Sequence, residues 1–292
     1  MTARAGRYAV LVPPYVWMLA FFALPILVVF AISMTDAVVG IPPFSDLMGW
    51  SPPRFLGDTE NYALLLSDSY YLDGFVGSLR IAAVSTVLCL LIGYPMALAI
   101  ARVRPSRRLA LLLLLMLPFW TSFLIRTYAW MTLLNSNGIV NNGLLALGLI
   151  ETPVPLLYTD FSVYLGIVYA YLPFMVLPIY AVIERHDLTL LEAAADLGAK
   201  TLRSFLLVTL PLSIPGIAAG SLLVFVPALG EFVVPELLGG SDFLMIGRML
   251  WTETFQNRDW PLAAAVTIAL LFLVVAAVLS VQWVVDLRER PQ

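Results

Sequence analysis

The stretch LLEAAADLGAKTLRSFLLVTLP, residues 190–211, has charged and small residues in a pattern suited to binding a surface rather than to bond chemistry. Thr189 and Glu192 have the spacing of a capping box, in which the threonine hydroxyl accepts a hydrogen bond from the Glu192 N–H group and the glutamate carboxylate accepts one from the Thr189 N–H group. Gly198 stands where a helix would end in a left-handed cap. The pattern predicts a helix over residues 190–197, about 12 Å long.

A helix of two turns is only marginally stable by itself in water, so it needs a surface on which to dock. Ala193, Ala194 and Ala195 make this helix thin enough to enter a cleft, and Glu192 and Asp196 can meet polar walls. An amphipathic loop lying on a membrane surface would explain the same residues equally well. Local chemistry leaves both interpretations open.

Patterns that would carry out a reaction are missing from the sequence. The only lysine, Lys200, follows Ala199, so no G-K-[ST] phosphate loop exists. His186 is the only histidine, which excludes H-E-x-x-H and any two-histidine metal site. No G-x-S-x-G nucleophile elbow occurs. We therefore expect a protein that is not an enzyme and that binds no metal, cofactor or nucleic acid itself.

Long apolar segments are the elements that must position this stretch. Of the 292 residues, 61% are hydrophobic and 12% are charged, and the charged fraction is about half that of a soluble domain. A helix that spans a membrane needs about 20 apolar residues. The sequence predicts six such helices, at about residues 10–34, 76–101, 108–131, 160–183, 212–230 and 260–285. It thus indicates an all-α polytopic membrane protein with a single transmembrane domain over residues 1–292, and a loop at 184–211 between the fourth and fifth spans.

Basic residues indicate the orientation of these spans. Because the number of spans is even, both termini lie on one side. That side holds Arg4, Arg7, Arg102, Arg104, Arg107, Arg108, Arg185, Lys200, Arg203, Arg288 and Arg290. The opposite loops hold only Arg54, Arg248 and Arg258. The positive-inside rule makes the first side cytoplasmic, so we expect both termini and the loop 184–211 in the cytoplasm.

Two features inside the spans carry structural expectations. Arg126 lies some 18 residues into the third span, roughly 27 Å along a straight helix, so we expect its side chain to extend to the outer interface. Gly216 and Gly220 form a G-x-x-x-G pattern that lets helices approach closely. Packing within the chain is the expected use of the two glycines, and a contact between subunits is the alternative.

The loop resembles the EAA loop of ABC importer permeases, whose pattern is EAA, three residues, Gly, nine residues and I-x-L-P. The matching residues, all in register, are Glu192, Ala193, Ala194, Gly198, Leu210 and Pro211. Val208 stands where the family usually has isoleucine. The resemblance implies the fold of a type I ABC importer permease, in which this loop forms a coupling helix that seats in a groove of a separate ATPase subunit. That subunit would bind ATP and Mg²⁺.

Further segments resemble the polyamine (spermidine/putrescine) permeases, and among them the putrescine permease subunits. These segments are LPFWTSFLIRTYAWMTLLNSNGIVNN (117–142), GIVYAYLPFMVLPIYA (166–181), GEFVVPELLGG (230–240), MIGRMLW (245–251) and NRDWPLAAAV (257–266). The resemblance implies a complex in the bacterial inner membrane with a second, different permease subunit, two cytoplasmic ATPase subunits and a periplasmic substrate-binding protein. This chain would form half of the pathway for putrescine or spermidine, which operates by alternating access.

A polyamine pathway should carry carboxylates and aromatic faces, because ammonium groups bind both. The outer half of the chain offers Asp160, Glu231, Glu236, Tyr128, Trp130 and Trp251. Glu231 follows the fifth span directly, and Pro227 could kink that helix towards the pathway. Each candidate has an ordinary alternative role, since tyrosine and tryptophan are common at membrane interfaces and outer acids can contact the binding protein.

Two other transport functions remain open. An ABC permease for another small solute would share the EAA loop, because the binding protein normally selects the solute. A secondary transporter driven by an ion gradient would tend to have paired inverted repeats with broken helices at matching positions, and the sequence shows no such pairing.

Overall fold

The structure is a computed structural model that describes residues 11–50, 53–187, 189–240 and 243–289. Arg4, Arg7 and Arg290, which support the predicted orientation, lie outside these residues. The chain forms two compact units. The first contains Met1–Asp73 and Met249–Leu273, and the second contains Gly74–Arg248 and Val274–Gln292. Two long helices, α4 (Ser69–Arg102) and α15 (Trp260–Glu289), contribute residues to both units.

The first described element of the first unit is a long apolar helix, Leu11–Ile32, which contains a π-helical turn η1 (Leu19–Ala23) and α2 (Leu24–Ile32). It continues with β1 (Met48–Trp50), β2 (Pro53–Phe55), α3 (Glu60–Ser67) and, later in the chain, η4 (Thr252–Asn257). The Asn61 side-chain amide donates to the carbonyls of Ser33 and Thr35, at 3.1 and 2.9 Å, and so ties α3 to the end of α2. The antiparallel β1–β2 hairpin is an addition to the predicted all-α fold.

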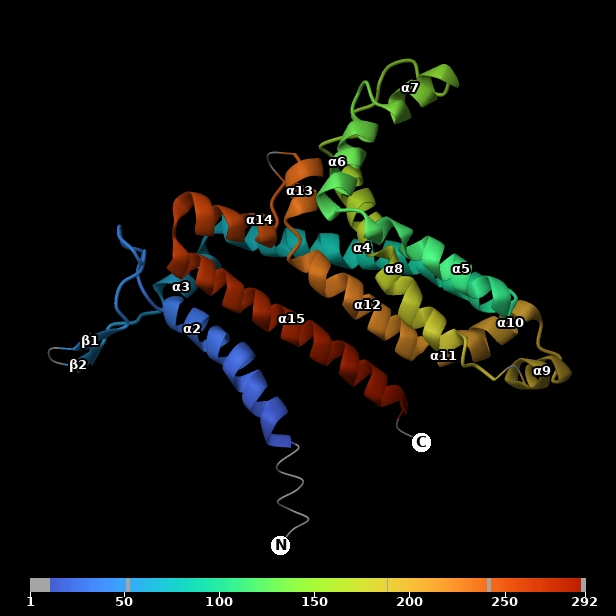
Figure 1. Ribbon diagram of the computed structural model, residues 1–292, viewed down its shortest axis with the longest axis horizontal. Coiled ribbons are helices and arrows are strands. Elements are labelled where there is room, and N and C mark those ends of the chain that lie inside the picture. Colours follow the sequence, from blue (N-terminus) through green and yellow to red (C-terminus); the bar gives the residue numbers. More distant parts are fainter. Residues whose placement is uncertain (1–10, 51–52, 188, 241–242, 290–292) are drawn as a thin grey trace, which may run out of the picture. The chain divides into compact units, whose positions relative to one another are not determined.

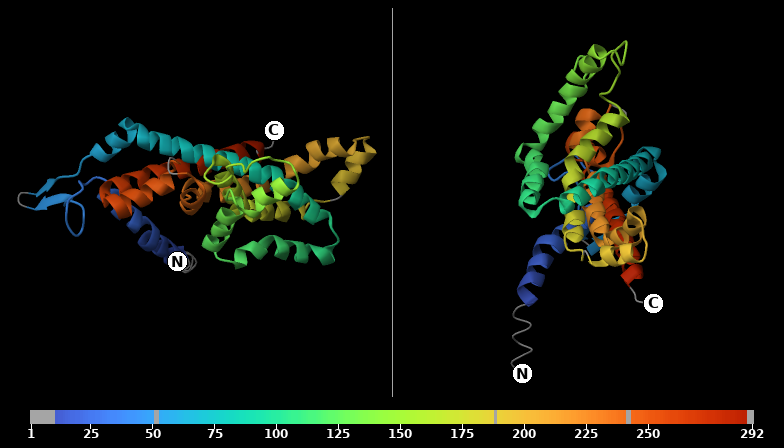
Figure 2. Two further views of the ribbon diagram at one scale, coloured as in Figure 1. Left: turned by 90° about the horizontal axis from the view of Figure 1, so that it is seen from above. Right: turned by 90° about the vertical axis from the view of Figure 1, so that its right-hand side faces the viewer.

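The second unit contains the segments predicted to carry function. Its elements besides parts of α4 and α15 are α5 (Pro105–Met116), η2 (Leu117–Trp120), α6 (Phe123–Leu134), α7 (Ile139–Ala146), α8 (Asp160–Ile183), α9 (Thr189–Asp196), α10 (Thr201–Ser204), η3 (Phe205–Thr209), α11 (Leu210–Leu212), α12 (Ile214–Leu229), α13 (Val233–Leu238) and the first half of α14 (Ile246–Trp251). Its core is built from residues of α4, α8 and α12, among them Cys89, Met175 and Val224. These helices leave α9 and α10 at the same end of the unit as the α4–α5 turn (Figures 1 and 2).

Helices α8 and α12 pack closely because two glycines lie between them (Figure 1). A Cβ atom added to Gly216 would lie 2.9 Å from the carbonyl oxygen of Pro178, and one added to Gly220 would lie 3.0 Å from that of Met175. Both distances are too short for a larger residue unless the backbone moves. The predicted use of the G-x-x-x-G pattern for packing within the chain is confirmed.

Six segments of the described chain could cross a membrane by length and composition, if two bent pairs each count as one. The continuous helices are Leu11–Ile32, Ser69–Arg102, Asp160–Ile183 and Trp260–Trp283. The bent pairs are Pro105–Trp120 with Phe123–Ala146, at 87°, and Thr201–Leu212 with Ile214–Leu229, at 62°. Each predicted span overlaps one of these six segments.

The third predicted span, 108–131, is broken rather than straight. Thr121 and Ser122 have extended backbone conformations, with ψ angles of 154° and 138°. The Thr121 hydroxyl donates to the carbonyl of Pro118 at 2.8 Å, a local bond of the kind that competes with helical hydrogen bonds. The path of 27 Å that we expected from residue 108 to Arg126 assumed a straight helix, so it does not hold.

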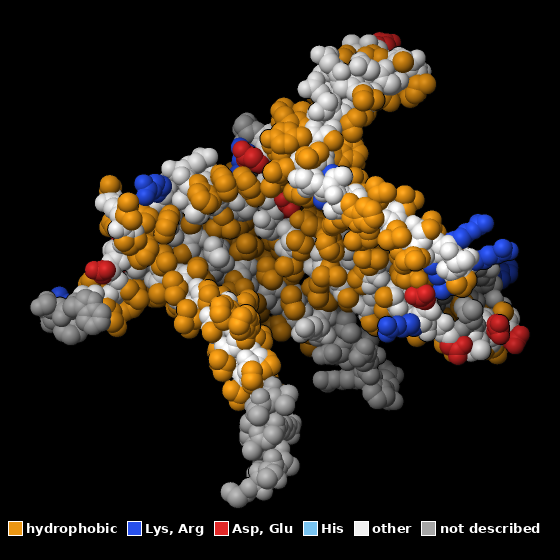
Figure 3. Space-filling model, viewed as in Figure 1, with side chains coloured by type: hydrophobic (Ala, Val, Ile, Leu, Met, Phe, Trp, Pro, Cys, Tyr) orange, Lys and Arg blue, Asp and Glu red, His pale blue; other side chains and the backbone are white. Residues whose placement is uncertain are grey.

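Hydrophobic side chains cover most of the face shown in Figure 3, as expected for helices in contact with lipid or with other membrane subunits. Charged side chains of both signs gather at the end of the second unit, where α9, α10 and the start of α5 lie (Figures 1 and 3). The charged residues of the 184–211 loop therefore lie at one polar end of the second unit (Figure 3).

Candidate coupling site and transport pathway

The predicted coupling helix is α9, which spans Thr189–Asp196, one position before the predicted 190–197. Gly198 has a φ angle of +79°. Its N–H group donates to the Ala195 carbonyl at 2.8 Å, and the Ala199 N–H group donates to the Ala194 carbonyl at 3.0 Å. These two bonds are those of a Schellman motif. The left-handed cap predicted at Gly198 is confirmed, and it depends on backbone conformation alone, since a Cβ atom there would meet nothing within 4 Å.

The start of α9 differs from the prediction. The Thr189 N–H group donates to Asp187 Oδ1 at 2.9 Å, so the carboxylate that serves it is that of Asp187 and not that of Glu192. Thr189 is already the first residue of α9, which leaves Asp187 in the position that favours a bond to the N–H group two residues on. This bond stabilises the charged form and holds the pKa of the exposed Asp187 carboxyl below its ordinary value of 3.8.

The EAA-pattern residues differ in exposure. Glu192, Ala193, Gly198 and Pro211 are exposed, whereas Ala194 and Leu210 are half-buried. Leu210 packs against the core formed by α4, α8 and α12. The segment 184–211, which we call the coupling segment, can therefore present α9 to a partner while Leu210, near its other end, packs against the spans.

Aromatic and hydroxyl contacts join the same segment to α4. The ring of Phe205 lies edge-on to that of Tyr94, with centroids 5.7 Å apart and an interplanar angle of 80°. The Tyr94 hydroxyl is also hydrogen-bonded to that of Ser213 at 3.0 Å. A displacement of α10 and η3 would thus be transmitted to α4 as well as to α12.

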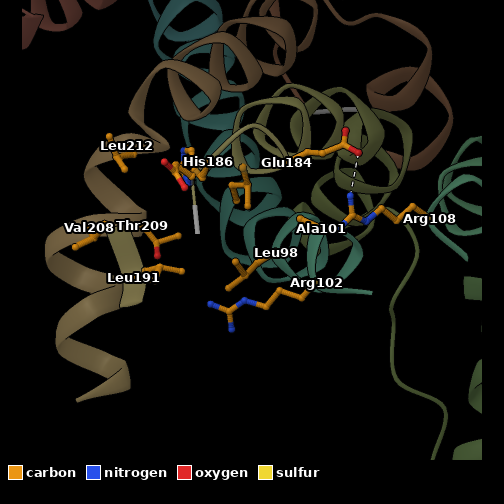
Figure 4. Close-up of a pocket in the computed structure, with 12 residues that line it drawn as sticks. Leu98, Ala101, Arg102, Arg108, Glu184, His186, Leu191, Val208, Thr209 and Leu212 are labelled. Atoms are coloured by element: carbon orange, nitrogen blue, oxygen red, sulfur yellow. Dashed lines mark hydrogen bonds and ion pairs between the residues drawn. The ribbon is translucent and has the colours of Figure 1, made fainter. Parts of the chain in front are cut away.

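A cavity of about 310 Å³ lies between this segment and the ends of α4 and α8 (Figure 4). It is lined by Leu98, Ala101, Arg102, Arg108, Ile183, Glu184, His186, Asp187, Leu191, Val208, Thr209 and Leu212. At its edge Arg108 forms an ion pair with Glu184 at 3.1 Å, which connects α5 to the end of α8. The cavity thus lies where the connection between α8 and α9 meets α4 and η3.

Glu231 lies at the other end of α12, as predicted, and is buried with 7% of its surface exposed. The Tyr171 hydroxyl donates to its Oε2 atom. Its Oε1 atom accepts bonds from the N–H groups of Val233 and Val234, at 3.0 and 3.4 Å. Glu231 therefore caps α13 and holds it to α8, in addition to any role that it has in transport.

Glu236 has a partner that the sequence did not indicate. Its Oε2 atom lies 3.0 Å from Arg248 Nε, and Arg248 also donates to the Gly240 carbonyl at 3.0 Å. The pair closes the segment between α13 and α14. Glu236 is consequently a weaker candidate for binding a cation than Glu231, whose described bonds come from neutral donors.

The other four pathway candidates are spread over the fold. Trp130 on α6 lies edge-on to Tyr169 on α8, with centroids 5.4 Å apart, whereas Tyr128 on the same helix is exposed. Asp160 is the exposed first residue of α8. Trp251 belongs to the first unit, where its ring stacks on Phe255 at 4.3 Å. Within the second unit, α13 packs against both α6 and α8, so Glu231, Glu236 and Trp130 share one neighbourhood of helices.

The described residues contain one group of acids close enough to hold a metal ion: Asp36, Asp58 and Glu60. All three are exposed, and Asp58 Oδ1 already accepts a bond from the Glu60 N–H group at 2.9 Å. Clusters of this kind are common without a metal, so we assign it no function.

Comparison with known proteins identifies the family. A family model described as "Binding-protein-dependent transport system inner membrane component" matches residues 11–290. The chain belongs to this family. The prediction of an inner-membrane permease, drawn from the EAA pattern, is thereby confirmed.

Two relatives and one solved structure show how far this family likeness extends. The spermidine/putrescine transport system permease protein PotB of Haemophilus influenzae is 41% identical over 257 residues, which cover 88% of this chain and 86% of the relative. PotB of Escherichia coli K12 is 44% identical over 224 residues, covering 77% and 81%.

The solved structure is a bacterial alginate ABC transporter in complex with an alginate pentasaccharide-bound periplasmic protein. One of its chains matches with a TM-score of 0.68 at 22% identity, covering 94% of this chain and 92% of that chain. At this identity the match speaks for the fold alone, and it confirms the predicted fold of an ABC transporter permease.

Proposed function

We propose that this chain is a permease subunit of an ATP-driven importer and forms half of the translocation pathway for putrescine and spermidine. The observation that carries the proposal is the 41% identity, over 88% of the chain, to a permease of a spermidine/putrescine transport system. The buried carboxylate of Glu231, held by neutral donors at the end of α12, supports a cationic substrate.

The proposed complex contains a second, different permease subunit, two ATPase subunits and a periplasmic substrate-binding protein. Both termini and the segment 184–211 face the cytoplasm. There α9, with Glu192 and Ala193 on its exposed surface, seats in a groove of one ATPase subunit, which binds the ATP and Mg²⁺.

The proposed cycle uses α9 to move the spans. When the ATPase subunits close on ATP, α9 moves with them, and the packed residues Phe205 and Leu210 carry the displacement to the core of α4, α8 and α12. The pathway then opens to the outside, where the binding protein delivers the polyamine. ATP hydrolysis returns the spans to the inward-open arrangement.

The decisive experiment is uptake by proteoliposomes. Vesicles that contain this chain, its partner permease and the ATPase, supplied with the binding protein, should accumulate radiolabelled putrescine or spermidine only when ATP is enclosed. A complex whose ATPase cannot hydrolyse ATP is the matched control and should accumulate neither.

Two results would contradict the proposal at different levels. Vesicles that hold only this chain and accumulate polyamine under a proton or sodium gradient would identify a secondary transporter. A complete complex that imports another solute with ATP, and neither polyamine, would preserve the permease and overturn the substrate.

A further inference from the structure

Arg126 lies just beyond the break in the third predicted span. The break at Thr121 and Ser122 turns α6 by 87° from the preceding helix, so irregular backbone occurs inside an apolar segment. Within membranes such backbone is found where it is buried in protein or lines a water-filled cavity. Discontinuous helices of this kind form substrate sites in other transporters.

The Arg126 guanidinium is held by aromatic faces. Its Cζ atom lies 4.9 Å from the ring centroid of Phe119 and 5.6 Å from that of Phe123, both within the range of a cation–π contact. Its Nε and Nη1 atoms are buried and have no hydrogen-bond partner among the residues that the structure describes. Aromatic faces without a carboxylate hold a buried guanidinium only weakly. Another cation could therefore displace it from the two rings.

The same aromatic group leads to Glu231. Phe119 lies edge-on to Phe174 of α8, with centroids 5.3 Å apart, and Phe174 lies 6.1 Å from the ring of Tyr171. The Tyr171 hydroxyl donates to Glu231. The rings of Phe119, Phe174 and Tyr171 therefore form a row. At one end of this row lie the aromatic faces that contact the Arg126 guanidinium, and at the other end lies the buried carboxylate of Glu231.

We propose that Phe119 and Phe123 form a subsite for one ammonium group of a linear diamine or polyamine, and that Arg126 is a tethered cation which leaves these faces when the substrate binds. The second ammonium group of the substrate lies towards Glu231, and the apolar chain between them follows the rings of Phe174 and Tyr171. This inference rests on the proposed function, because it assumes that the substrate is a polyamine.

Equilibrium binding of putrescine tests the proposal. The assembled importer, without nucleotide and without binding protein, is compared as wild type, Arg126→Gln, Phe119→Leu with Phe123→Leu, and the combination of all three. Arg126→Gln should tighten putrescine binding by about threefold to tenfold, because it removes the competing cation and leaves the rings. The two leucine substitutions should weaken binding, and in their presence Arg126→Gln should no longer tighten it.

Three controls define the outcomes. Arg107→Gln removes an exposed charge at the start of α5 and should leave putrescine binding unchanged. n-Butylamine, which has one ammonium group, should bind more weakly than putrescine to every variant that keeps both rings. Size-exclusion chromatography confirms that each variant assembles with its partners.

The inference is overturned if Arg126→Gln binds putrescine as the wild type does or more weakly, as a purely structural arginine would require. It is also overturned if the gain is equally large in the leucine background, which would indicate general charge repulsion. A wild-type importer that takes up neither polyamine overturns the proposed function and this inference together, whereas normal uptake without the Arg126→Gln gain overturns only the inference.

Discussion

Gly198 is the residue on which the proposed coupling helix depends most directly. Its φ angle of +79° is one that side chains with a Cβ atom adopt at a cost, and the space around it is open. Gly148 provides a natural comparison in the same unit. It has a φ angle of +69°, an equally open surrounding, and the same two bonds at the end of α7.

Gly198→Val should uncouple ATP hydrolysis from transport. The left-handed conformation costs about 1–2 kcal/mol for a residue with a Cβ atom, so the end of α9 should unwind and polyamine uptake should fall roughly tenfold. Gly148→Val has the same backbone cost away from the coupling segment and should keep most of its uptake. Uptake and ATPase rates of the two assembled variants are measured side by side. Equal uptake by both would remove α9 from the coupling role.

Glu231→Gln separates the charge of this side chain from its role as a helix cap. The amide oxygen can still accept the bonds from Val233 and Val234, and the amide NH2 group, in place of Oε2, can donate to the Tyr171 hydroxyl, so the variant should assemble normally. The negative charge is lost, and we expect uptake of a polyamine to require a substrate concentration roughly tenfold higher, which corresponds to about 1.4 kcal/mol of lost charge-assisted binding. Concentration-dependent uptake measures this shift. Wild-type kinetics would exclude Glu231 from the pathway.

Helices α8 and α12 are positioned against each other by small residues at the contact between them. The α8–α12 pair depends on Gly216 and Gly220, where the two backbones approach within the distance that a Cβ atom would need. This pair carries the core against which Leu210 packs, so its geometry also determines how the coupling segment is anchored.

Gly220→Val should separate α8 from α12 and destabilise the protein. The new side chain would meet the backbone and sulfur of Met175, an overpacking that typically costs about 1–3 kcal/mol. Ala219→Val, on an exposed face of the same helix, is the matched control and should change stability little. Thermal unfolding at one fixed scan rate should give a Tm that is lower by roughly 2–4 °C for each kcal/mol. Identical midpoints for the two variants would contradict the packing argument.

Sequence reasoning succeeded for elements whose signals are local. The apolar runs predicted where the long helices lie, and the position of Gly198 predicted the left-handed cap, because both depend on neighbouring residues. The break at Thr121 and Ser122 was not predicted, since a hydroxyl bond to the Pro118 carbonyl has no distinctive pattern in an apolar segment.

Pairs that are distant along the chain were beyond the sequence patterns. Tyr171 and Glu231 are 60 residues apart, and no local feature of either residue indicates the other. The Arg248 partner of Glu236 was likewise missed, because its position depends on how the chain between α13 and α14 folds back. The structural partners of the acidic residues predicted for the transport pathway can therefore be identified only in the folded chain.

At the scale of the whole molecule, the orientation of the chain in the membrane is a prediction that rests on basic residues. The chain is well suited to a labelling test because Cys89 is its only cysteine and is fully buried. Leu197, beside the coupling helix, is 90% exposed, and Val39, in the loop predicted to lie outside, is fully exposed. Each can become the single reactive thiol of the chain.

A maleimide that cannot cross membranes should label Leu197→Cys only in inside-out vesicles and Val39→Cys only in right-side-out vesicles. The reason is that the proposed orientation places the segment 184–211 in the cytoplasm and the segment that follows the first span outside. In inside-out vesicles, bound ATPase subunits should also slow the labelling of Leu197→Cys, and stripping them from the membrane should restore it. The unsubstituted chain, with Cys89 buried, is the blank for both preparations. Labelling of Leu197→Cys from the outer side would reverse the predicted orientation, and with it the assignment of α9 to a cytoplasmic ATPase.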